Sequence, residues 1–329
     1  MKEYDFVLAS GAEHLRGSLE QFGFHVFTSG LNHDNKRFFP NSDLYTRISD
    51  VSRFSNRRVV VVQSCTGSTP VQEEFFTTAD RVQELILILD VLRKPLEVKK
   101  IGHKKYDTKE IAPPRSVEVV LTFQPFALQD KAFQTGETSS CRCAMQQIAK
   151  LCDKMWNVAP VVDSSLSWVQ DLSKLCTYEE IEIVSEIIEF AAKKFEFDDY
   201  VLTAPDEGAQ ERFGLPGFKK ARTDSFKIKL SGDLDVEGKN VIVVDDLTKS
   251  GTTLLRAADM LYEQGAVNVG LVVLHVTPIR DNGEVLFEQL ITKSHNRVVV
   301  SDTVYSKAFC QKNPELVYNI ADKLTTSLG

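Results

Sequence analysis

The sequence contains no hydrophobic run long enough to cross a membrane. None of its apolar stretches approaches the ~18 residues that a membrane-spanning helix requires. The N-terminus, MKEYDFVLASG, has neither the basic region nor the apolar region of a secretory signal. The chain also lacks an excess of positive charge: its net charge of −7 at pH 7 argues against nucleic-acid or membrane-surface partners. We therefore expect a cytoplasmic protein that binds no nucleic acid and no membrane.

The sequence also lacks the spacing of a metal site built from cysteine and histidine. Of its six cysteines, only Cys141 and Cys143 lie close together, and they lack the second pair that a zinc site needs. The six histidines are dispersed, with no H-x-x-x-H or H-E-x-x-H spacing. We expect reduced thiols scattered through a cytosolic protein.

The sequence does contain short apolar runs that alternate with amphipathic segments. The predicted strands are YDFVLAS, RRVVVVQS, VEVVLTF, YVLTAP, NVIVVDD, VGLVVLHV and NRVVVSD. The predicted helices cover residues 77–94, 143–156, 179–195 and 254–265. Apolar strands that alternate with helices are typical of parallel sheets covered on both faces, so we predict an α/β fold.

The length of 329 residues predicts two domains, because single cores stop growing at roughly 250–300 residues. We expect an N-terminal domain over residues 1–158 and a C-terminal domain over residues 159–312. A C-terminal helix, residues 313–329, is expected to pack back on the first domain. The polar segment 99–116 contains two consecutive prolines and is predicted to be an exposed loop.

One segment, VIVVDDLTKSGTTLL over residues 241–255, carries the clearest chemistry. In parallel α/β sheets, ligands bind at the carboxyl ends of strands, where helix N-termini present unpaired N–H groups. Asp245 and Asp246 follow the apolar residues 241–244, and the hydroxyl-rich residues 250–253 precede a helix predicted to begin at Leu254. Hydroxyls and backbone amides would bind a phosphate there, with Gly251 allowing close approach. The two carboxylates would accept hydrogen bonds from sugar hydroxyls or hold a divalent metal.

The alternative is an acidic surface turn in which one hydroxyl caps an ordinary helix. Capping explains a single serine or threonine, but it does not explain two adjacent carboxylates at the end of a buried strand. We therefore favour a binding site.

This segment resembles the ribose-5-phosphate loop shared by phosphoribosyltransferases and phosphoribosyl pyrophosphate (PRPP) synthetases. Nearly the whole chain is similar to the synthetases, most of all to their divergent, plant-type class. FFPNSDLYTRI resembles the family's adenine-binding segment, and VVVVQSCTGSTPVQEEF its V-Q-S strand. VEVVLTFQPFALQDKAF resembles the P-Y-A-R-Q-D-R segment, LTAPDEGAQERFG the S-P-D-x-G-x-x-K-R segment, and GFKKARTDSFKIKL the catalytic K-x-R strand with its flexible loop. A plain phosphoribosyltransferase would leave the first 150 residues unexplained.

The resemblance implies two similar phosphoribosyltransferase-like domains, each a mostly parallel sheet flanked by helices. It implies an enzyme that transfers the β,γ-diphosphoryl group of ATP to the 1-hydroxyl of ribose 5-phosphate, giving PRPP and AMP. Mg²⁺ is the implied cofactor, because charge on the transferring group needs cations around it. The segment TDSFKIKL would close over the site and exclude water. A homo-oligomer, at least a dimer, is implied, in which a neighbouring copy's FFPNSDLYTRI completes the adenine site.

The resemblance also assigns roles to particular residues. The catalytic cations would be Lys220 and Arg222. Ribose 5-phosphate would be bound by Asp245, Asp246, Thr248, Lys249, Ser250, Gly251, Thr252 and Thr253. ATP would be bound by Phe39, Asn41, Asp43, Gln129 and Asp130. Asp206 and Asp163 would hold the metal.

The sequence departs from the family pattern mainly on the ATP side. Asn41 stands where the family has Asp, Leu128 where it has Arg, and Ser165 where it has His. In the phosphate loop, Lys249 replaces an acidic residue. Two alternatives therefore stay open beside an active PRPP synthetase. One is a catalytically impaired regulatory subunit, and the other is a diphosphokinase for a different ribose phosphate, such as ADP-ribose.

Overall fold

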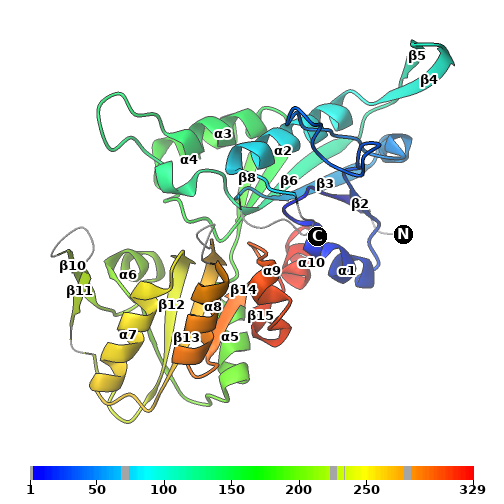
Figure 1. Cartoon of the computed structure of the whole chain (residues 1–329). Helices are drawn as coiled ribbons and strands as arrows, with labels where there is room; N and C mark the ends of the chain where they lie inside the picture. The colour runs from blue at the N-terminus through cyan, green and yellow to red at the C-terminus, as the bar shows by residue number, and fades with distance from the viewer. Residues whose placement is uncertain (1–2, 68–73, 223–227, 233, 278–282) are drawn as a thin grey trace. The chain divides into compact units, whose positions relative to one another are not determined.

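The computed structural model describes residues 3–67, 74–222, 228–232, 234–277 and 283–329 (Figure 1). The chain forms two compact units, one of Met1–Ile181 with Ala321–Gly329 and one of Glu182–Ile320. The boundary lies after Ile181 rather than after residue 158, because the strand Thr177–Ile181 pairs with the sheet of the first unit. Only the last nine residues return to the first unit, and residues 313–320 belong to the second.

The first unit is built on a six-stranded sheet in which every neighbouring pair is parallel, in the order β2-β1-β3-β6-β7-β8. The strands are β1 (Tyr4–Leu8), β2 (Val26–Thr28), β3 (Arg58–Ser64), β6 (Ser116–Phe123), β7 (Lys154–Val158) and β8 (Thr177–Ile181). The helices are α1 (Arg16–Gln21), α2 (Thr78–Arg93), α3 (Ser140–Ala149), α4 (Ser167–Gln170) and α10 (Ala321–Ser327). Helices α2 and α3 cover one face, and α1 and α10 cover the other (Figure 1).

Burial of both sheet faces explains why the central strands are unbroken apolar runs. In β3, Val59 and Val61 pack into the core beneath α2, and Val60 and Val62 are fully buried as well. A strand with only one buried face would alternate apolar and polar residues. Helix α2 starts at a capping box, in which Thr77 and Asp80 satisfy each other's backbone N–H groups.

The second unit repeats this architecture with a five-stranded parallel sheet, in the order β15-β14-β13-β12-β9. The strands are β9 (Val201–Thr203), β12 (Asn240–Thr248), β13 (Asn268–Val276), β14 (Val298–Ser301) and β15 (Val317–Tyr318). The helices are α5 (Val184–Phe195), α6 (Glu207–Phe213), α7 (Thr252–Glu263), α8 (Gly283–Lys293) and α9 (Lys307–Cys310). The predicted α/β fold with mostly parallel sheets flanked by helices is confirmed.

Two antiparallel hairpins stand beside these sheets. One pairs β10 (Lys219–Arg222) with β11 (Ile228–Ser231) in the second unit. The other pairs β4 (Leu96–Gly102) with β5 (Lys105–Glu110) in the first unit. The prediction of a loop over residues 99–116 was therefore wrong, because residues 99–102 and 105–110 belong to strands β4 and β5.

All seven predicted strands are present, but some helix boundaries differ. The helix predicted over residues 143–156 spans Ser140–Ala149, and Lys154–Val158 is instead a sheet strand, β7. The helix predicted over residues 179–195 begins at Val184, because residues up to Ile181 form β8. Among the described residues, no helix has both the length and the apolar character that crossing a membrane requires.

Candidate functional site

The carboxylates of Asp245 and Asp246 lie at the carboxyl end of β12, as the sequence predicted. The strand does not stop before them: it continues to Thr248 and pairs with β13 as far as Val276. The side chain of Asp245 is buried, and that of Asp246 is partly buried. Both carboxylates are therefore positioned by the sheet itself and not by a surface turn.

Asp246 is paired with a cation from the neighbouring helix. Nη1 of Arg212, in α6, lies 3.2 Å from Oδ2 of Asp246. Burial raises the pKa of Asp246 above its usual value, and the charge of Asp206 raises that pKa further, whereas Arg212 lowers it. Asp206 caps α6 by accepting a hydrogen bond from the N–H of Ala209 at 3.3 Å. The β12 end thus brings together three acidic side chains and one arginine.

The segment from Thr248 to Thr253 turns from β12 into α7. The Gly251 N–H donates to the Thr248 hydroxyl at 3.0 Å, and the hydroxyl oxygens of Ser250 and Thr252 lie 3.0 Å apart. Helix α7 begins at Thr252, so Thr252 and Thr253 lie in its first turn and Lys249 is exposed before it. Hydroxyls and N–H groups at a helix start form an arrangement that can bind a phosphate.

Gly251 is also required by the local packing. Its φ is +66°, in the left-handed region, and a Cβ would lie 2.6 Å from a methyl carbon of Leu290. The missing side chain therefore admits Leu290 of α8 and a tight turn, and its role in the approach of a phosphate stays a prediction.

Lys220 and Arg222 lie on the same strand, β10, where they pair in register with Leu230 and Ile228 of β11. The segment just before this strand is held to α6 and to the end of β9. Gln210 of α6 donates through Nε2 to the carbonyl of Phe218 at 2.8 Å, and Ala204 forms an isolated parallel β-bridge with Gly217. Residues 223–227 of the predicted flexible loop lie outside the described residues.

The predicted adenine-binding residues lie on a small hairpin-like turn in the first unit. The Tyr45 N–H donates to the Arg37 carbonyl at 2.7 Å, and the Phe39 N–H donates to the Asp43 carbonyl at 2.8 Å. Asn41 donates through Nδ2 to Oδ2 of Asp43 at 2.6 Å. Phe39 is half-buried, whereas Asn41 and Asp43 are exposed at the end of the turn.

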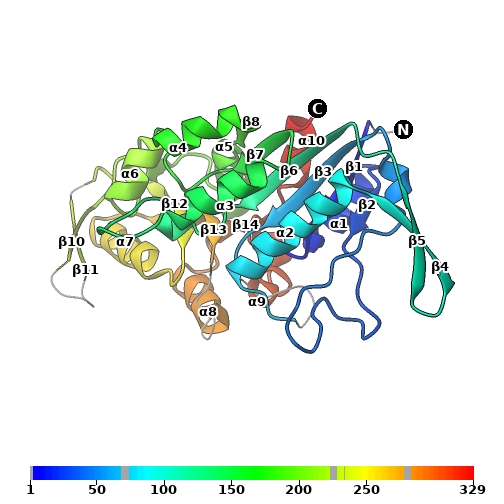
Figure 2. The same ribbon diagram turned by 90° about the horizontal axis from the view of Figure 1, so that it is seen from above.

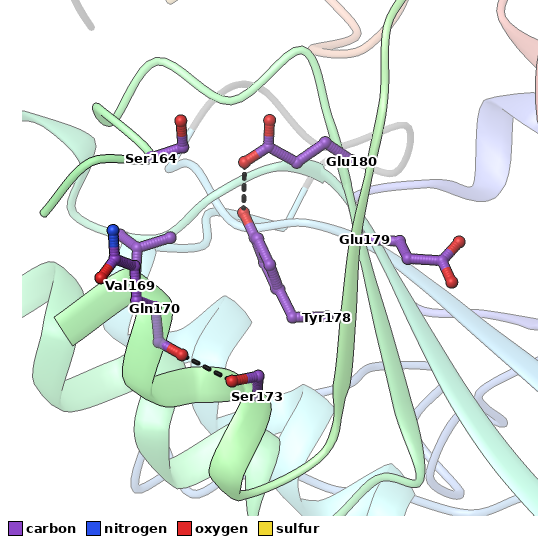
Figure 3. Close-up of a pocket in the computed structure, with 7 residues that line it drawn as sticks. All are labelled: Ser164, Val169, Gln170, Ser173, Tyr178, Glu179 and Glu180. Carbon is purple, nitrogen blue, oxygen red and sulfur yellow. Dashed lines mark hydrogen bonds between the residues drawn. The ribbon is translucent and has the colours of Figure 1, made fainter. Parts of the chain in front are cut away.

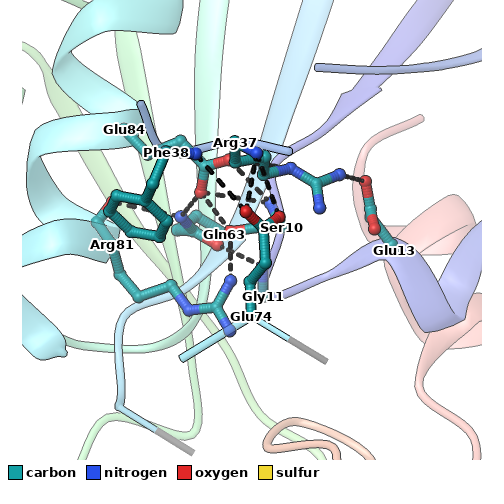
Figure 4. A network of polar contacts seen from close by, with 9 residues as sticks. All are labelled: Ser10, Gly11, Glu13, Arg37, Phe38, Gln63, Glu74, Arg81 and Glu84. Atoms are coloured by element: carbon teal, nitrogen blue, oxygen red, sulfur yellow. Dashed lines mark hydrogen bonds and ion pairs between the residues drawn. The ribbon is translucent and has the colours of Figure 1, made fainter. Parts of the chain in front are cut away.

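A buried polar network holds the base of this turn (Figure 4). The guanidinium of Arg37 is paired with Glu13, and its Nε lies 3.8 Å from Oε1 of Glu84. Glu84 also accepts hydrogen bonds from the Ser10 N–H at 3.2 Å and from Nε2 of Gln63 at 3.0 Å.

Two further members complete the network. Glu74 accepts from the Arg37 N–H at 2.8 Å, and buried Arg81 donates to the Ser10 hydroxyl. Burial lowers the pKa of Arg81 to about 10. Losing one partner of such a network leaves a buried charge uncompensated, which typically costs about 3–5 kcal/mol.

Gln129 and Asp130 lie in the first unit at the start of α3. The Ser140 hydroxyl donates to Oε1 of Gln129, and the Asp130 carbonyl accepts from Ser139 at 2.6 Å and from Nε1 of Trp168 at 3.0 Å. Leu128, which stands in place of the family's arginine, is 60% exposed.

Asp163 lies in an exposed loop of the first unit, where the Ser165 N–H donates to its Oδ1 at 2.8 Å. That hydrogen bond lowers the pKa of Asp163. The other predicted metal ligand, Asp206, belongs to the second unit, so their pairing stays a prediction.

A pocket of about 410 Å³ lies beside this loop, lined by Ser164, Val169, Gln170, Ser173, Tyr178, Glu179 and Glu180 (Figure 3). The Tyr178 hydroxyl donates to Oε1 of Glu180 at 3.3 Å. Burial raises the pKa of Tyr178, so the hydroxyl keeps its proton at neutral pH. Two glutamates among the lining residues disfavour a triphosphate in this pocket.

Among the residues that the structure describes, no three or more histidine, cysteine, aspartate or glutamate side chains are grouped to hold a metal ion alone. Mg²⁺ commonly binds through only one or two carboxylates, with waters and substrate phosphates completing its coordination. The carboxylates of Asp206 and Asp246 fit that mode of binding. Burial raises the pKa of Asp246, the charge of Asp206 raises it further, and a bound cation would favour the ionised form.

Comparisons with known proteins identify sequences and a fold to which this chain is similar. The family model described as a phosphoribosyl transferase domain matches residues 166–303. The ribose-phosphate pyrophosphokinase of Pyrococcus abyssi is 25% identical over 314 residues, covering 91% of this chain and 92% of the relative. That of Pyrococcus furiosus is 25% identical over 279 residues, covering 82% and 85%. Over most of its length, the chain is therefore similar to ribose-phosphate pyrophosphokinases.

A solved structure extends the likeness across both units. The crystal structure of phosphoribosylpyrophosphate synthetase from Mycobacterium smegmatis matches with a TM-score of 0.68 at 18% identity, covering 99% of this chain and 98% of the other. This match confirms the fold of two phosphoribosyltransferase-like domains. Similarity to the plant-type class in particular, and the roles assigned to individual residues, stay predictions.

Arg212 and the Arg37 network were not among the residues predicted from the sequence. Arg212 belongs to LTAPDEGAQERFG and aligns with the family's arginine in K-R, which was the available signal. Nothing local marks Arg37, because its partners Glu13 and Glu84 lie 24 residues before it and 47 residues after it.

Glu13 makes folding stability depend on pH. Burial, partly offset by Arg37, raises its pKa from 4.5 to about 7. Between these values the folded protein keeps a proton that the unfolded chain releases, so this group's contribution to stability falls as pH rises from about 4.5 to 7. We predict that Glu13→Gln removes this decline, which is worth roughly 3 kcal/mol at most. Urea unfolding between pH 5 and 8 measures it.

The matched control is Glu20→Gln, which alters an exposed pair with Arg16 and should keep the wild-type slope. Buried Asp302, whose pKa is also raised to about 7, adds the same sign of slope to all three proteins and cancels in the comparison. The prediction would be contradicted if the free energy of unfolding changed with pH in the same way in the wild type and in Glu13→Gln.

Proposed function

We propose that the protein is a ribose-phosphate diphosphokinase, which transfers the β,γ-diphosphoryl group of ATP to the 1-hydroxyl of ribose 5-phosphate. The observation that carries the proposal is the β12 end, where two carboxylates precede a hydroxyl-bearing turn into α7. Carboxylates accept hydrogen bonds from sugar hydroxyls, and the start of a helix binds phosphate. Ribose 5-phosphate carries both groups at opposite ends of one small molecule.

The proposed roles divide the substrate between these elements. Asp245 and Asp246 would accept from the ribose 2- and 3-hydroxyls, with Arg212 holding the Asp246 carboxylate in place. The turn residues Thr248, Lys249, Ser250, Gly251, Thr252 and Thr253 would bind the 5-phosphate. In this proposal the 1-hydroxyl would remain available to the diphosphoryl donor.

Transfer requires attack of the 1-hydroxyl oxygen on the β-phosphorus of ATP, with AMP as the leaving group. Lys220 and Arg222, close together on β10, would stabilise the negative charge on the transferring group. Mg²⁺, which Asp206 is proposed to help hold, would supply charge neutralisation on the diphosphoryl oxygens. Asp163 is proposed as a further metal ligand.

ATP would be held by Phe39, Asn41, Asp43, Gln129 and Asp130. Phe39 offers a ring for adenine stacking, and the exposed Asn41 and Asp43 offer polar groups to the base edge. The base of this turn is fixed by buried Arg37, which limits the ordering cost of binding. We propose a homo-oligomer, at least a dimer, in which the turn of one copy serves the site of another.

A catalytically impaired regulatory subunit is the second candidate. The observation that favours it is Leu128, an exposed apolar side chain where the family carries an arginine, together with Ser165 at the histidine position. An altered acceptor with an additional phosphate is the third candidate, favoured by the exposed Lys249.

The first test is AMP release with Mg²⁺, ATP and ribose 5-phosphate. We predict release that depends on ribose 5-phosphate and falls at least ~100-fold in Lys220→Ala, because the loss of one charge-stabilising donor typically costs that much. Lys219→Ala, which removes the adjacent lysine of the same strand, is the matched control and should retain most activity. AMP release only with another ribose phosphate would support the third candidate, and none with any acceptor would support the second.

The second test separates acceptor binding from chemistry. Asp246→Asn should raise the KM for ribose 5-phosphate by roughly 10–100-fold, because charge-assisted hydrogen bonds are worth about 1.5–3 kcal/mol, while the KM for ATP changes little. Asp259→Asn, an equal change on the exposed side of α7, should leave both constants unchanged. A rise confined to the KM for ATP would contradict the assignment of Asp246 to the binding of ribose 5-phosphate.

A further inference from the structure

Two buried cysteines of the first unit lie next to each other, although they are far apart in the sequence. Cys152 lies between α3 and β7, and Cys176 directly precedes β8. Strands β7 and β8 lie side by side at one edge of the six-stranded sheet (Figure 2). Their parallel pairing brings the residues that precede them together as well.

The strand register indicates how close the backbones of the two cysteines are. Lys154 pairs with Thr177, and the Thr177 N–H donates to the Asp153 carbonyl at 3.0 Å. By extension of this register, Cys176 lies opposite Asp153 and one residue along from Cys152. Strands about 4.8 Å apart with a rise of about 3.3 Å per residue separate two such Cα atoms by about 6 Å. A disulfide joins Cα atoms that are about 4.4–6.8 Å apart.

The two side chains are also in contact. Both belong to the apolar cluster that includes Val117 and Met155, and both are free thiols. The Cys152 thiol donates a hydrogen bond to the sulfur of Cys176, which lowers the pKa of Cys176 and raises that of Cys152. Cys152 and Cys176 keep small exposed fractions, 5% and 7%, and exposed Leu175 directly precedes Cys176. The pair therefore lies at the margin of the core.

The hydrogen bond distinguishes this pair from other buried cysteines. Burial raises the pKa of Cys65, Cys141 and Cys310, so these thiols keep their protons at neutral pH. The thiolate, and not the thiol, is the nucleophile that attacks an oxidant or a disulfide. Cys176 is therefore the nucleophile of the pair, and Cys152 is the thiol beside it.

The charged groups beside the pair are themselves paired. Nη2 of Arg93 lies 2.9 Å from Oδ1 of Asp153. Arg93 favours a thiolate at Cys152, whereas Asp153 disfavours a thiolate at both cysteines. The hydrogen bond between the thiols is the largest effect on each of them, so it decides which cysteine loses its proton more readily.

We propose that Cys152 and Cys176 are a redox-modification site at which hydrogen peroxide forms a reversible disulfide. The Cys176 sulfur attacks one peroxide oxygen and the O–O bond breaks, which gives a sulfenic acid and water. The Cys152 sulfur then attacks the sulfenic sulfur, so an S–S bond forms and the hydroxyl leaves as water with the Cys152 proton. The two thiols together lose two electrons and two protons, and the peroxide is reduced to two waters.

The disulfide closes a ring that contains residues 153–175. This segment includes β7, α4 and the exposed loop of Asp163, so the bridge restrains both ends of the loop that carries a proposed metal ligand. The inference does not rest on the proposed enzymatic activity, because disulfide formation is measured on the protein alone.

The first test is peptide mapping of the full-length protein after treatment with hydrogen peroxide. The starting protein is Cys143→Ser, which removes the exposed thiol and so prevents its own oxidation from obscuring the result. We predict a cross-linked peptide that joins Cys152 to Cys176, with a mass lower by two hydrogen atoms and lost on treatment with dithiothreitol. A cross-link from either cysteine to a different one, or irreversible oxidation of Cys176 alone, overturns the proposal.

The second test traps the sulfenic acid with dimedone and so identifies the cysteine that attacks first. In Cys152→Ser the serine hydroxyl still donates a hydrogen bond, but no second thiol can resolve the sulfenic acid. We predict at least ~10-fold more adduct at Cys176 in this variant than at Cys152 in Cys176→Ser, because the thiolate is the nucleophile. Cys310→Ser is the matched control and should form the disulfide as the wild type does.

Equal adducts at the two positions, or no adduct in either variant, overturn the assigned order of attack. The peptide mapping leaves both cysteines of the pair in place, so it decides the proposal even where a serine variant fails to fold.

Discussion

Burial of both faces of each parallel sheet is the constraint on which this structure depends. It favours nearly continuous apolar runs in strands such as β3 and β12, so Val59–Val62 and Val241–Val244 contain no polar side chain. Polar chemistry is therefore collected at the strand ends and in the segments that follow them. For that reason, the polar groups of the candidate site gather at one end of the sheet. They are Asp206 in the turn after β9, Asp245 and Asp246 in β12, and the hydroxyls of residues 248–253. The hairpin of β4 and β5 shows the converse, because its apolar side chains, among them Val98 and Tyr106, are exposed.

The same constraint explains how much of the fold the sequence could predict. Runs such as RVVVVQS can be recognised as strands because a strand buried on both faces does not alternate apolar and polar residues. All seven strands predicted in this way are present. Strands β7 and β8 were missed because KMWNV and TYEEI mix apolar and polar residues next to true helices, and the helical pattern extended over them. Strand β8 also determines the boundary between the units, so missing it moved the expected boundary to residue 158. The 99–116 segment was predicted to be a loop because its lysines and prolines dominate its composition, although alternate residues pair across β4 and β5.

The candidate site also has one part that could be predicted from the sequence and one part that could not. Its contiguous part, Asp245 to Thr253, could be identified from one stretch of sequence because the strand, turn and helix that form it are consecutive. The Arg37 network could not, because Arg37 pairs with Glu13 and Glu84 across distant segments. The K-R pattern marked Arg212, but nothing in the sequence indicated its pairing with Asp246. These buried pairs hold the predicted substrate residues in position, and exposed Asn41 and Asp43 depend on buried Arg37 for their placement. The departures from the family pattern at Leu128 and Ser165 lie in the first unit, whereas the acidic cluster at the β12 end lies in the second.

The central claim is that the β12 end accepts ribose 5-phosphate for the transfer of an intact diphosphoryl group. Phosphorus-31 NMR of the products formed from ATP, ribose 5-phosphate and Mg²⁺ tests it most directly, because it reports which phosphorus atoms move together. The account predicts a new diphosphoryl group on carbon 1 of ribose 5-phosphate, formed in equal amount with AMP. Formation of ADP with a monophosphorylated sugar, or ATP left unchanged with every ribose phosphate offered, would contradict it.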